Sequence, residues 1–151
     1  MEKLLGYYNR LKEFDAVFND DFPNDPIAFG QLFLNQSPNG FVQARGLIWE
    51  VDDVGILYLT NIGVKSATAH FTFWDQRIRG REPLIRAMIK YGMKEYGFER
   101  IETRAALYAT RAIRAVERIG FVKEGRLRKS VSFKGELFDA YVYSLLREEV
   151  L

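Results

Sequence analysis

The 151-residue sequence contains no cysteine and a single histidine, His70. Without cysteine the chain can form no disulfide and no thiolate nucleophile, and it cannot build a cysteine-ligated zinc site. One histidine is also too few for a histidine-rich metal centre. We therefore expect no bound metal.

Long apolar segments are missing as well. No stretch of the sequence approaches the roughly 20 consecutive apolar residues that a membrane-spanning helix needs. The N-terminal residues contain no basic start followed by an uninterrupted apolar core, so they do not resemble a signal peptide. These absences predict a soluble, cytoplasmic protein with no membrane partner.

The charge is small in total but unevenly distributed. The net charge is +2, yet seventeen of the 22 basic residues follow residue 75, together with ten of the 20 carboxylates. This imbalance predicts an anionic ligand on the C-terminal half, for which a nucleic acid, a nucleotide and a phosphorylated cofactor are all candidates. A solvated basic face without a ligand is the alternative.

The length and the hydrophobic fraction of 48% predict one packed domain over residues 1–151. Apolar residues at three- and four-residue steps indicate helices, whereas runs of β-branched and aromatic residues indicate strands. Residues 1–40 are expected to be helical and residues 41–149 to form the sheet and its ligand site. Asp25 is expected to cap the second helix and Thr110 the fourth. The helices are predicted over residues 4–18, 25–34, 83–96 and 110–119, and the strands over residues 41–51, 55–60, 67–74, 98–108, 121–133 and 137–146.

This order of elements predicts an α/β (α+β) fold. Strand–helix–strand units inside a mostly antiparallel set imply a mixed sheet with helices on its faces. In the strand over residues 67–74, His70 and Thr72 share one face, and Phe71 and Phe73 share the other.

A basic segment, Arg77-Ile78-Arg79-Gly80-Arg81-Glu82, lies between a predicted strand and a predicted helix. The free N–H groups and the dipole at the start of a helix favour an anion. Gly80 lets the backbone approach a ligand closely, and Arg77, Arg79 and Arg81 supply charge-assisted donors for phosphate oxygens. The segment is therefore predicted to be a phosphate-binding loop.

The same segment resembles most of the pyrophosphate loop of the GNAT acetyltransferases, Q/R-x-x-G-x-G/A, with Arg77 and Gly80 at the first two fixed positions. Residues 112–121, AIRAVERIGF, resemble the second GNAT motif, a helix that ends in a lysine- or arginine-containing turn before Gly-Phe. Residues 124–149 are similar to the closing hairpin of the RimJ/RimL-like branch. From this order and spacing the chain is identified as an atypical member of the GNAT superfamily.

The resemblance implies a V-shaped splay between two central parallel strands, with acetyl-coenzyme A as co-substrate. The pantetheine arm would pair with the backbone of Thr72, Phe73 and Trp74, and the pyrophosphate would lie over Arg77 to Glu82. The acetyl group would point toward the strand over residues 98–108. The implied reaction is direct attack of a primary amine, either a protein N-terminus or a small amine, on the thioester.

Three departures from the family pattern stand out. Glu82 replaces the second Gly or Ala of the loop, Ala109 and Ala112 replace a frequent Asn and Ser, and Val116 replaces the tyrosine that acts as general acid in many relatives. A carboxylate at position 82 suits the helix dipole but repels a pyrophosphate, and the three neighbouring arginines are expected to neutralise it. A catalytically degenerate GNAT-fold protein with a binding or assembly role is the alternative function.

Three residues are candidates for catalysis. His70 titrates near neutral pH and precedes the loop. Glu102 lies on the strand expected to flank the thioester, although a salt bridge to Arg100 or Arg104 is its structural alternative. Tyr108 ends that strand and could donate a proton to the leaving thiolate. For His70 a hydrogen-bonded structural role is the alternative.

A nucleic-acid-binding module is a third hypothesis. It would use the basic residues of the last hairpin, Arg126, Arg128, Lys129 and Lys134. Few aromatic residues alternate with these charges, as single-strand binding would require, so nucleic acid is the less favoured partner. The sequence leaves the oligomeric state open, a homodimer included.

Overall fold

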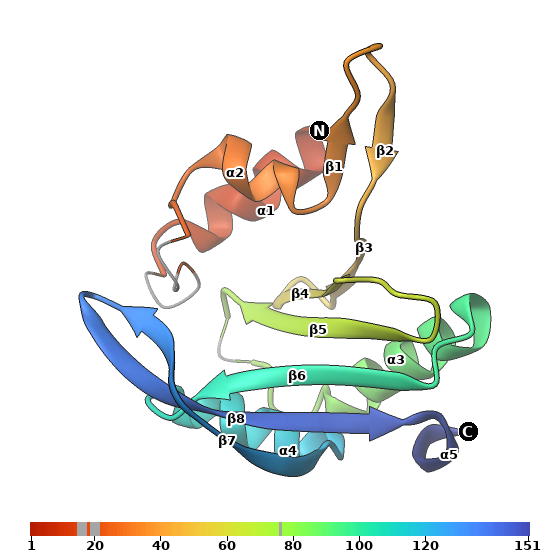
Figure 1. Cartoon of the computed structure of the whole chain (residues 1–151), viewed down its shortest axis with the longest axis vertical. Coiled ribbons are helices and arrows are strands. Elements are labelled where there is room, and N and C mark those ends of the chain that lie inside the picture. The colour runs from red at the N-terminus through yellow and green to blue at the C-terminus, as the bar shows by residue number, and fades with distance from the viewer. Residues whose placement is uncertain (15–17, 19–21, 76) are drawn as a thin grey trace.

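The protein is described here from a computed structural model, which places residues 1–14, 18, 22–75 and 77–151. A six-stranded sheet has the strand order β3-β4-β5-β6-β8-β7. All neighbours are antiparallel except β5 and β6, which run in the same direction (Figure 1). The predicted mixed, mostly antiparallel sheet is therefore confirmed. The strands are β3 (Leu47–Val51), β4 (Gly55–Thr60), β5 (Ser66–Phe73), β6 (Arg100–Ala106), β7 (Val122–Phe133) and β8 (Glu136–Leu146).

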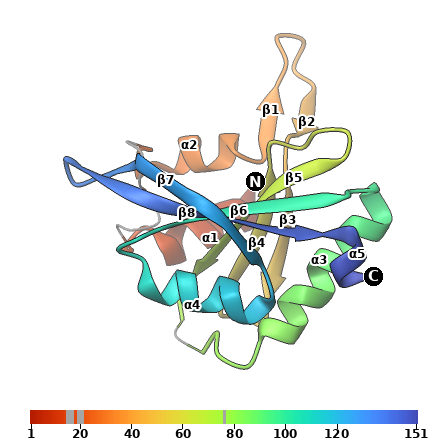
Figure 2. The same ribbon diagram turned by 60° about the horizontal axis from the view of Figure 1, so that its bottom comes forward.

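Helices cover both faces of the sheet. α3 (Glu82–Tyr96) and α4 (Thr110–Ile119) pack on one face, where their apolar residues join the main core, and Figure 2 shows them together on the near side of the sheet. α1 (Glu2–Leu11) and α2 (Pro26–Gln31) pack over β3 and β4 on the other face, where they form a second, aromatic-rich cluster. The sheet thus has a separate core on each side.

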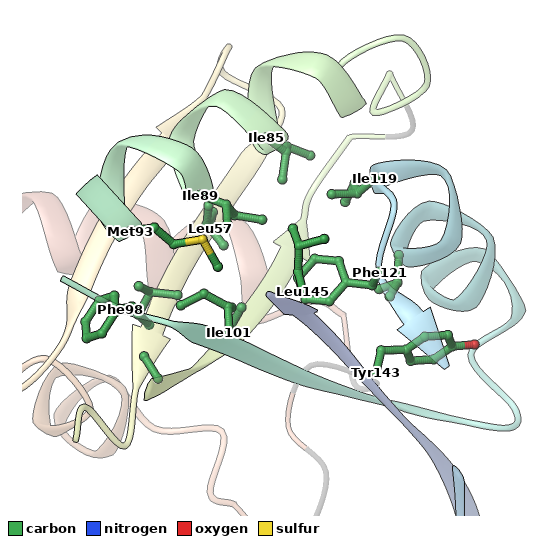
Figure 3. Close-up of a cluster of buried hydrophobic side chains, with 14 of the residues drawn as sticks. Leu57, Ile85, Ile89, Met93, Phe98, Ile101, Ile119, Phe121, Tyr143 and Leu145 are labelled. Carbon is green, nitrogen blue, oxygen red and sulfur yellow. The ribbon is translucent and has the colours of Figure 1, made fainter. Parts of the chain in front are cut away.

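The main core fixes α3 against the sheet. Ile85, Ile89 and Met93 lie four residues apart, so they share one side of the helix. All three are nearly inaccessible and belong to the same cluster as Leu57 of β4 and Ile101 of β6 (Figure 3). This packing determines where the start of α3, and therefore the basic loop, lies relative to the sheet.

The two faces of β5 are as predicted. Phe71 and Phe73 pack against the main core. His70 instead stacks on Tyr58, which belongs to the second cluster, with ring centroids 4.7 Å apart. The face opposite α3 and α4 therefore carries the only histidine.

The N-terminal part differs from the prediction in two respects. α1 ends at Leu11, and residues 15–17 of the predicted continuation lie outside the described residues. The segment before residue 41 is also not purely helical, because β1 (Leu34–Gln36) follows α2 and pairs with β2 (Val42–Ala44).

The predicted strand over residues 41–51 is broken into β2 and β3 at Gly46. A Cβ atom on Gly46 would lie 2.7 Å from the carbonyl oxygen of Leu59, so the two backbones approach more closely there than a side chain allows. By contrast, the predicted cap of α2 is confirmed, since an Asp25 carboxylate oxygen accepts from the backbone N–H groups of Ile27 and Ala28.

Two further differences concern the C-terminal half. The N-cap of α4 is Ala109, without a side-chain cap, and Thr110 is the first helical residue rather than the cap. A short helix, α5 (Arg147–Val150), follows β8 and was not predicted. Neither difference changes the order of the central strands.

Candidate active site

The central parallel strands diverge after a short paired stretch. Pairing of β5 with β6 covers Ser66 to Thr68 against Arg100 to Glu102, although β5 continues to Phe73 and β6 to Ala106. Just past the paired stretch, the Thr103 hydroxyl donates to the carbonyl oxygen of Ala69 at 2.8 Å. This is the predicted V-shaped splay, and it leaves the β6-facing edge of the last residues of β5 without a partner strand.

The side chains of the predicted pantetheine strand contact other parts of the protein or are buried. Phe73 packs in the main core, and the ring of Trp74 stacks on Tyr7 and donates to the carbonyl oxygen of Asp53 at 2.8 Å. The hydroxyl of Thr72 is buried and has no hydrogen-bond partner among the residues that the structure places. A ligand along this edge would therefore meet backbone groups rather than the aromatic rings.

The basic loop follows β5 and leads into α3, as predicted. Gly80 has a φ of +91°, and a Cβ atom built on it would meet no heavy atom within 4 Å, so the space beside it is open. Arg77 pairs with Asp75 at 2.6 Å, and Arg81 lies 3.7 Å from a carboxylate oxygen of Asp52. Two of the three loop arginines are thus already close to acidic partners, and the side chain of Arg79 is exposed.

Glu82 ends this loop and is the first residue of α3. One carboxylate oxygen accepts the backbone N–H of Gly80 at 2.7 Å, and the other accepts the Arg118 guanidinium at 2.7 Å. The Glu82 side chain is only 11% exposed. The arginine that neutralises Glu82 is therefore one from the end of α4, and the sequence prediction that its loop neighbours do so is wrong.

Arg118 was not among the predicted site residues. It lies 36 residues after Glu82 and reaches the loop because α3 and α4 pack on the same face of the sheet. The signal for it was present in the second motif, which typically has a basic residue in the turn before Gly-Phe. Val116, which replaces the family tyrosine, is 2% exposed and packs in the main core.

His70 is half-buried at the edge of a pocket of about 400 Å³ between α2, β4 and β5. A ring nitrogen lies 2.7 Å from the hydroxyl of Thr60. Burial lowers the pKa of His70 to about 4. The imidazole is therefore neutral at pH 7 and can accept a proton, but it is a weak base.

Glu102 lies on the same face of the sheet as His70. It pairs in register with Thr68, two residues before His70, at the point where the strands diverge. Its carboxylate lies 3.1 Å from Arg100 and 3.4 Å from Arg104. The salt bridges named as its structural alternative are thus both present.

Tyr108 is placed apart from these two residues. It follows the end of β6 and its ring packs between two aromatic residues of the final hairpin, with centroids 4.9 Å from Phe133 and 4.8 Å from Phe138. The structure therefore places His70 and Glu102 on the same face of the sheet, and it packs the ring of Tyr108 against the final hairpin.

The lowered pKa of His70 predicts a specific acid sensitivity. The unfolded chain binds a proton near pH 6.5 and the folded chain only near pH 4, so protonation favours unfolding across this window. Wild-type protein should lose about 2 kcal/mol relative to His70→Gln between pH 7 and pH 4.5. Urea unfolding at both pH values measures this difference, and NMR titration of the only imidazole checks the pKa. Equal acid sensitivity of both proteins would contradict the prediction.

The basic residues of the final hairpin are partly paired. Arg126 forms an ion pair with Asp139 at 2.7 Å, and the same carboxylate accepts the backbone N–H of Lys129 at 2.8 Å. The Lys134 ammonium lies over the ring of Phe133. The ion pair with Asp139 neutralises Arg126 and so reduces the charge that the hairpin offers to a nucleic acid.

No group of three or more His, Cys, Asp or Glu residues that could hold a metal ion occurs among residues 1–14, 18, 22–75 and 77–151. Within those same ranges, no helix is long and apolar enough to cross a membrane.

Known proteins resemble this chain in sequence. The protein p20 of Bacillus licheniformis, an uncharacterised N-acetyltransferase, is 35% identical over 65 residues, which are 43% of this chain and 36% of the relative. The putative ribosomal N-acetyltransferase YdaF of Bacillus subtilis is 28% identical over 108 residues, or 69% of this chain and 59% of the relative. The chain thus matches well under two thirds of the length of these relatives. The second relative agrees with the predicted RimJ/RimL-like branch.

A solved structure and a protein-family model also resemble this chain, in agreement with the sequence similarities. The crystal structure of a GNAT-family acetyltransferase from Bacillus anthracis superposes with a TM-score of 0.71 at 19% identity, covering 98% of this chain and 91% of that one. Residues 50–142, which are more than half of the chain, match the model of the acetyltransferase (GNAT) domain. The chain therefore belongs to the GNAT acetyltransferase family.

Proposed function

We propose that this protein is an acetyl-coenzyme A-dependent N-acetyltransferase that transfers an acetyl group to a primary amine by direct attack. The observation that supports this most is the open space at the Cβ position of Gly80, in the loop that leads from β5 into α3. An open glycine, a helix N-terminus and several arginines together suit a phosphate group. The loop fits the cofactor, apart from the Glu82 carboxylate.

The residues that would hold the cofactor are those of the loop and the β5 edge. The edge of β5 that faces away from β4 has no partner strand after Thr68, and there the backbone near Thr72 and Phe73 would lie along a pantetheine arm. Trp74 follows β5, and its backbone N–H is already donated to the carbonyl oxygen of Val54. The loop from Arg77 to Glu82, with Ile78, Arg79, Gly80 and Arg81, would hold the pyrophosphate. When bound, acetyl-coenzyme A supplies an acetyl thioester whose C–S bond breaks as the amine N–C bond forms.

The acceptor side would be the pocket beside His70. Only a neutral amine can attack the thioester. Deprotonating a lysine at pH 7 costs about 4.6 kcal/mol, whereas deprotonating an α-amine costs about 1 kcal/mol. Because His70 is a weak base, an α-amine of a protein or peptide is the acceptor that this site suits best. The putative ribosomal acceptor in the name of the B. subtilis relative agrees with such a substrate.

His70 and Glu102 are the proposed proton acceptors, since both lie on the acceptor face. Tyr108 is the proposed donor to the leaving thiolate, because it follows the end of β6, the strand that diverges from β5. We propose a reaction that uses no metal, because the sequence has no cysteine and a single histidine as potential ligands, and we propose the cytoplasm as its location.

The test combines binding and transfer. Isothermal calorimetry should detect acetyl-coenzyme A binding, and a peptide with a free N-terminus should be acetylated faster at pH 7 than an N-blocked peptide with a lysine. A thiol reagent detects the coenzyme A that is released. Because the protein has no cysteine, the reagent does not react with the protein itself. Failure to bind the cofactor at high micromolar concentration would reject the proposal, and binding without transfer would favour the degenerate alternative.

A further inference from the structure

The start of α3 already holds an anion that belongs to the protein. Both oxygens of the Glu82 carboxylate are engaged, one by the N–H of Gly80 and the other by Arg118, each at 2.7 Å. The carboxylate is also nearly shielded from solvent. A surface glutamate at the start of a helix would normally point into water, so this one is held in place.

The partners of Glu82 are those that a phosphate would use. The backbone N–H of a glycine with positive φ, the N-terminus of a fifteen-residue helix and a guanidinium are donors typical of phosphate sites. One carboxylate connects Gly80 with Arg118, so another small anion could accept from the same two groups. Glu82 therefore has the position and the charge of a bound phosphate.

The carboxylate remains charged in this setting. Burial acts to raise the pKa of Glu82, but hydrogen bonds from its own backbone N–H, from Arg118 and from Gly80 outweigh burial, and the pKa lies below its ordinary value. At neutral pH a phosphate could not share the loop with this carboxylate, because the two negative charges would repel each other and compete for the same donors.

We propose that Glu82 is a built-in competitor of the cofactor, which closes the phosphate loop until the pyrophosphate of acetyl-coenzyme A displaces it from Gly80. This inference rests on the proposed function, because it assumes that the loop takes the cofactor's pyrophosphate. Arg118 is a positioning residue in the closed state, since it holds the second oxygen of Glu82. The binding affinity of the cofactor is thereby set partly by a residue of the protein itself.

The closing experiment measures binding by calorimetry rather than activity. Acetyl-coenzyme A and inorganic pyrophosphate are titrated separately into wild-type protein, Glu82→Gln and Glu82→Ala. Both variants should bind both ligands about tenfold more tightly than wild type, which corresponds to about 1.4 kcal/mol. Glu82→Ala should show the larger gain, because the glutamine amide can still accept from Gly80.

The matched control is Glu95→Ala, in the last turn of the same helix. It removes the same charge at an exposed position far from the loop, and it should leave both affinities within about twofold of wild type. Thermal unfolding of each variant checks that it is folded. Glu82→Gln retains the shape of the side chain and keeps the test valid if the alanine variant is unstable.

The outcomes separate this inference from the proposed function. If wild type binds acetyl-coenzyme A and neither variant binds more tightly, Glu82 is only a helix cap and the competitor role is wrong, while the proposed function stands. If no protein binds acetyl-coenzyme A but the variants gain pyrophosphate binding, the competitor role at the loop stands and the cofactor assignment fails. If no protein binds either ligand, both are rejected.

Discussion

Glutamate in place of Gly80 should abolish acetyl-coenzyme A binding while the protein remains folded. The new side chain would enter the open space beside Gly80 and add a second carboxylate next to Glu82, at the position where a phosphate would accept the backbone N–H. If the cofactor phosphate loses two charge-assisted hydrogen bonds to the loop, its binding should weaken by roughly 100-fold or more. Calorimetry with acetyl-coenzyme A measures the change.

Gly97→Glu is the control for this variant. Gly97 ends α3, has a φ of +72° and, like Gly80, has open space around its Cβ position. The same side chain there carries the same backbone strain and the same charge, but at the other end of the helix from the loop. Equal losses of affinity in the two variants would show that strain or net charge, and not the loop, is responsible.

Alanine in place of Gly55 should destabilise the protein by about 3 kcal/mol, near the upper end of the usual range for overpacking. The added Cβ would lie 2.2 Å from a ring carbon of Phe73 and 2.5 Å from the carbonyl oxygen of Thr72. Because one of these contacts is backbone, β4 and β5 must move apart where they pair. Chemical unfolding followed by circular dichroism measures the loss.

The matched control is Gly125→Ala, at a glycine of β7 whose Cβ position has no neighbour within 4 Å. It should change the free energy of unfolding by no more than about 0.5 kcal/mol. Similar effects of both substitutions would mean that the close approach at Gly55 does not occur in solution. If it does occur, Gly55→Ala should also weaken cofactor binding, since Thr72 and Phe73 form the proposed pantetheine edge.

Much of the fold could be predicted because the hydrophobic pattern is local. The alternation of Phe71 and Phe73 with His70 requires only the two-residue repeat of a strand, and the α2 cap requires only an aspartate before proline. The break at Gly46 could not be predicted, because β2 pairs with β1 in a separate sheet whereas β3 pairs with β4, and both pairings form only when the chain folds.

The candidate site, too, has features that the sequence determined and features that only the folded structure shows. The sequence by itself determined the family motifs, the basic loop with Gly80 and the departure at Glu82. Only the tertiary structure decided that Glu82 accepts from Gly80 and pairs with Arg118 of another helix, and that burial lowers the pKa of His70 to about 4. The physical reason is that hydrogen bonding, charge pairing and desolvation depend on distances between residues far apart in the chain, and folding alone sets those distances.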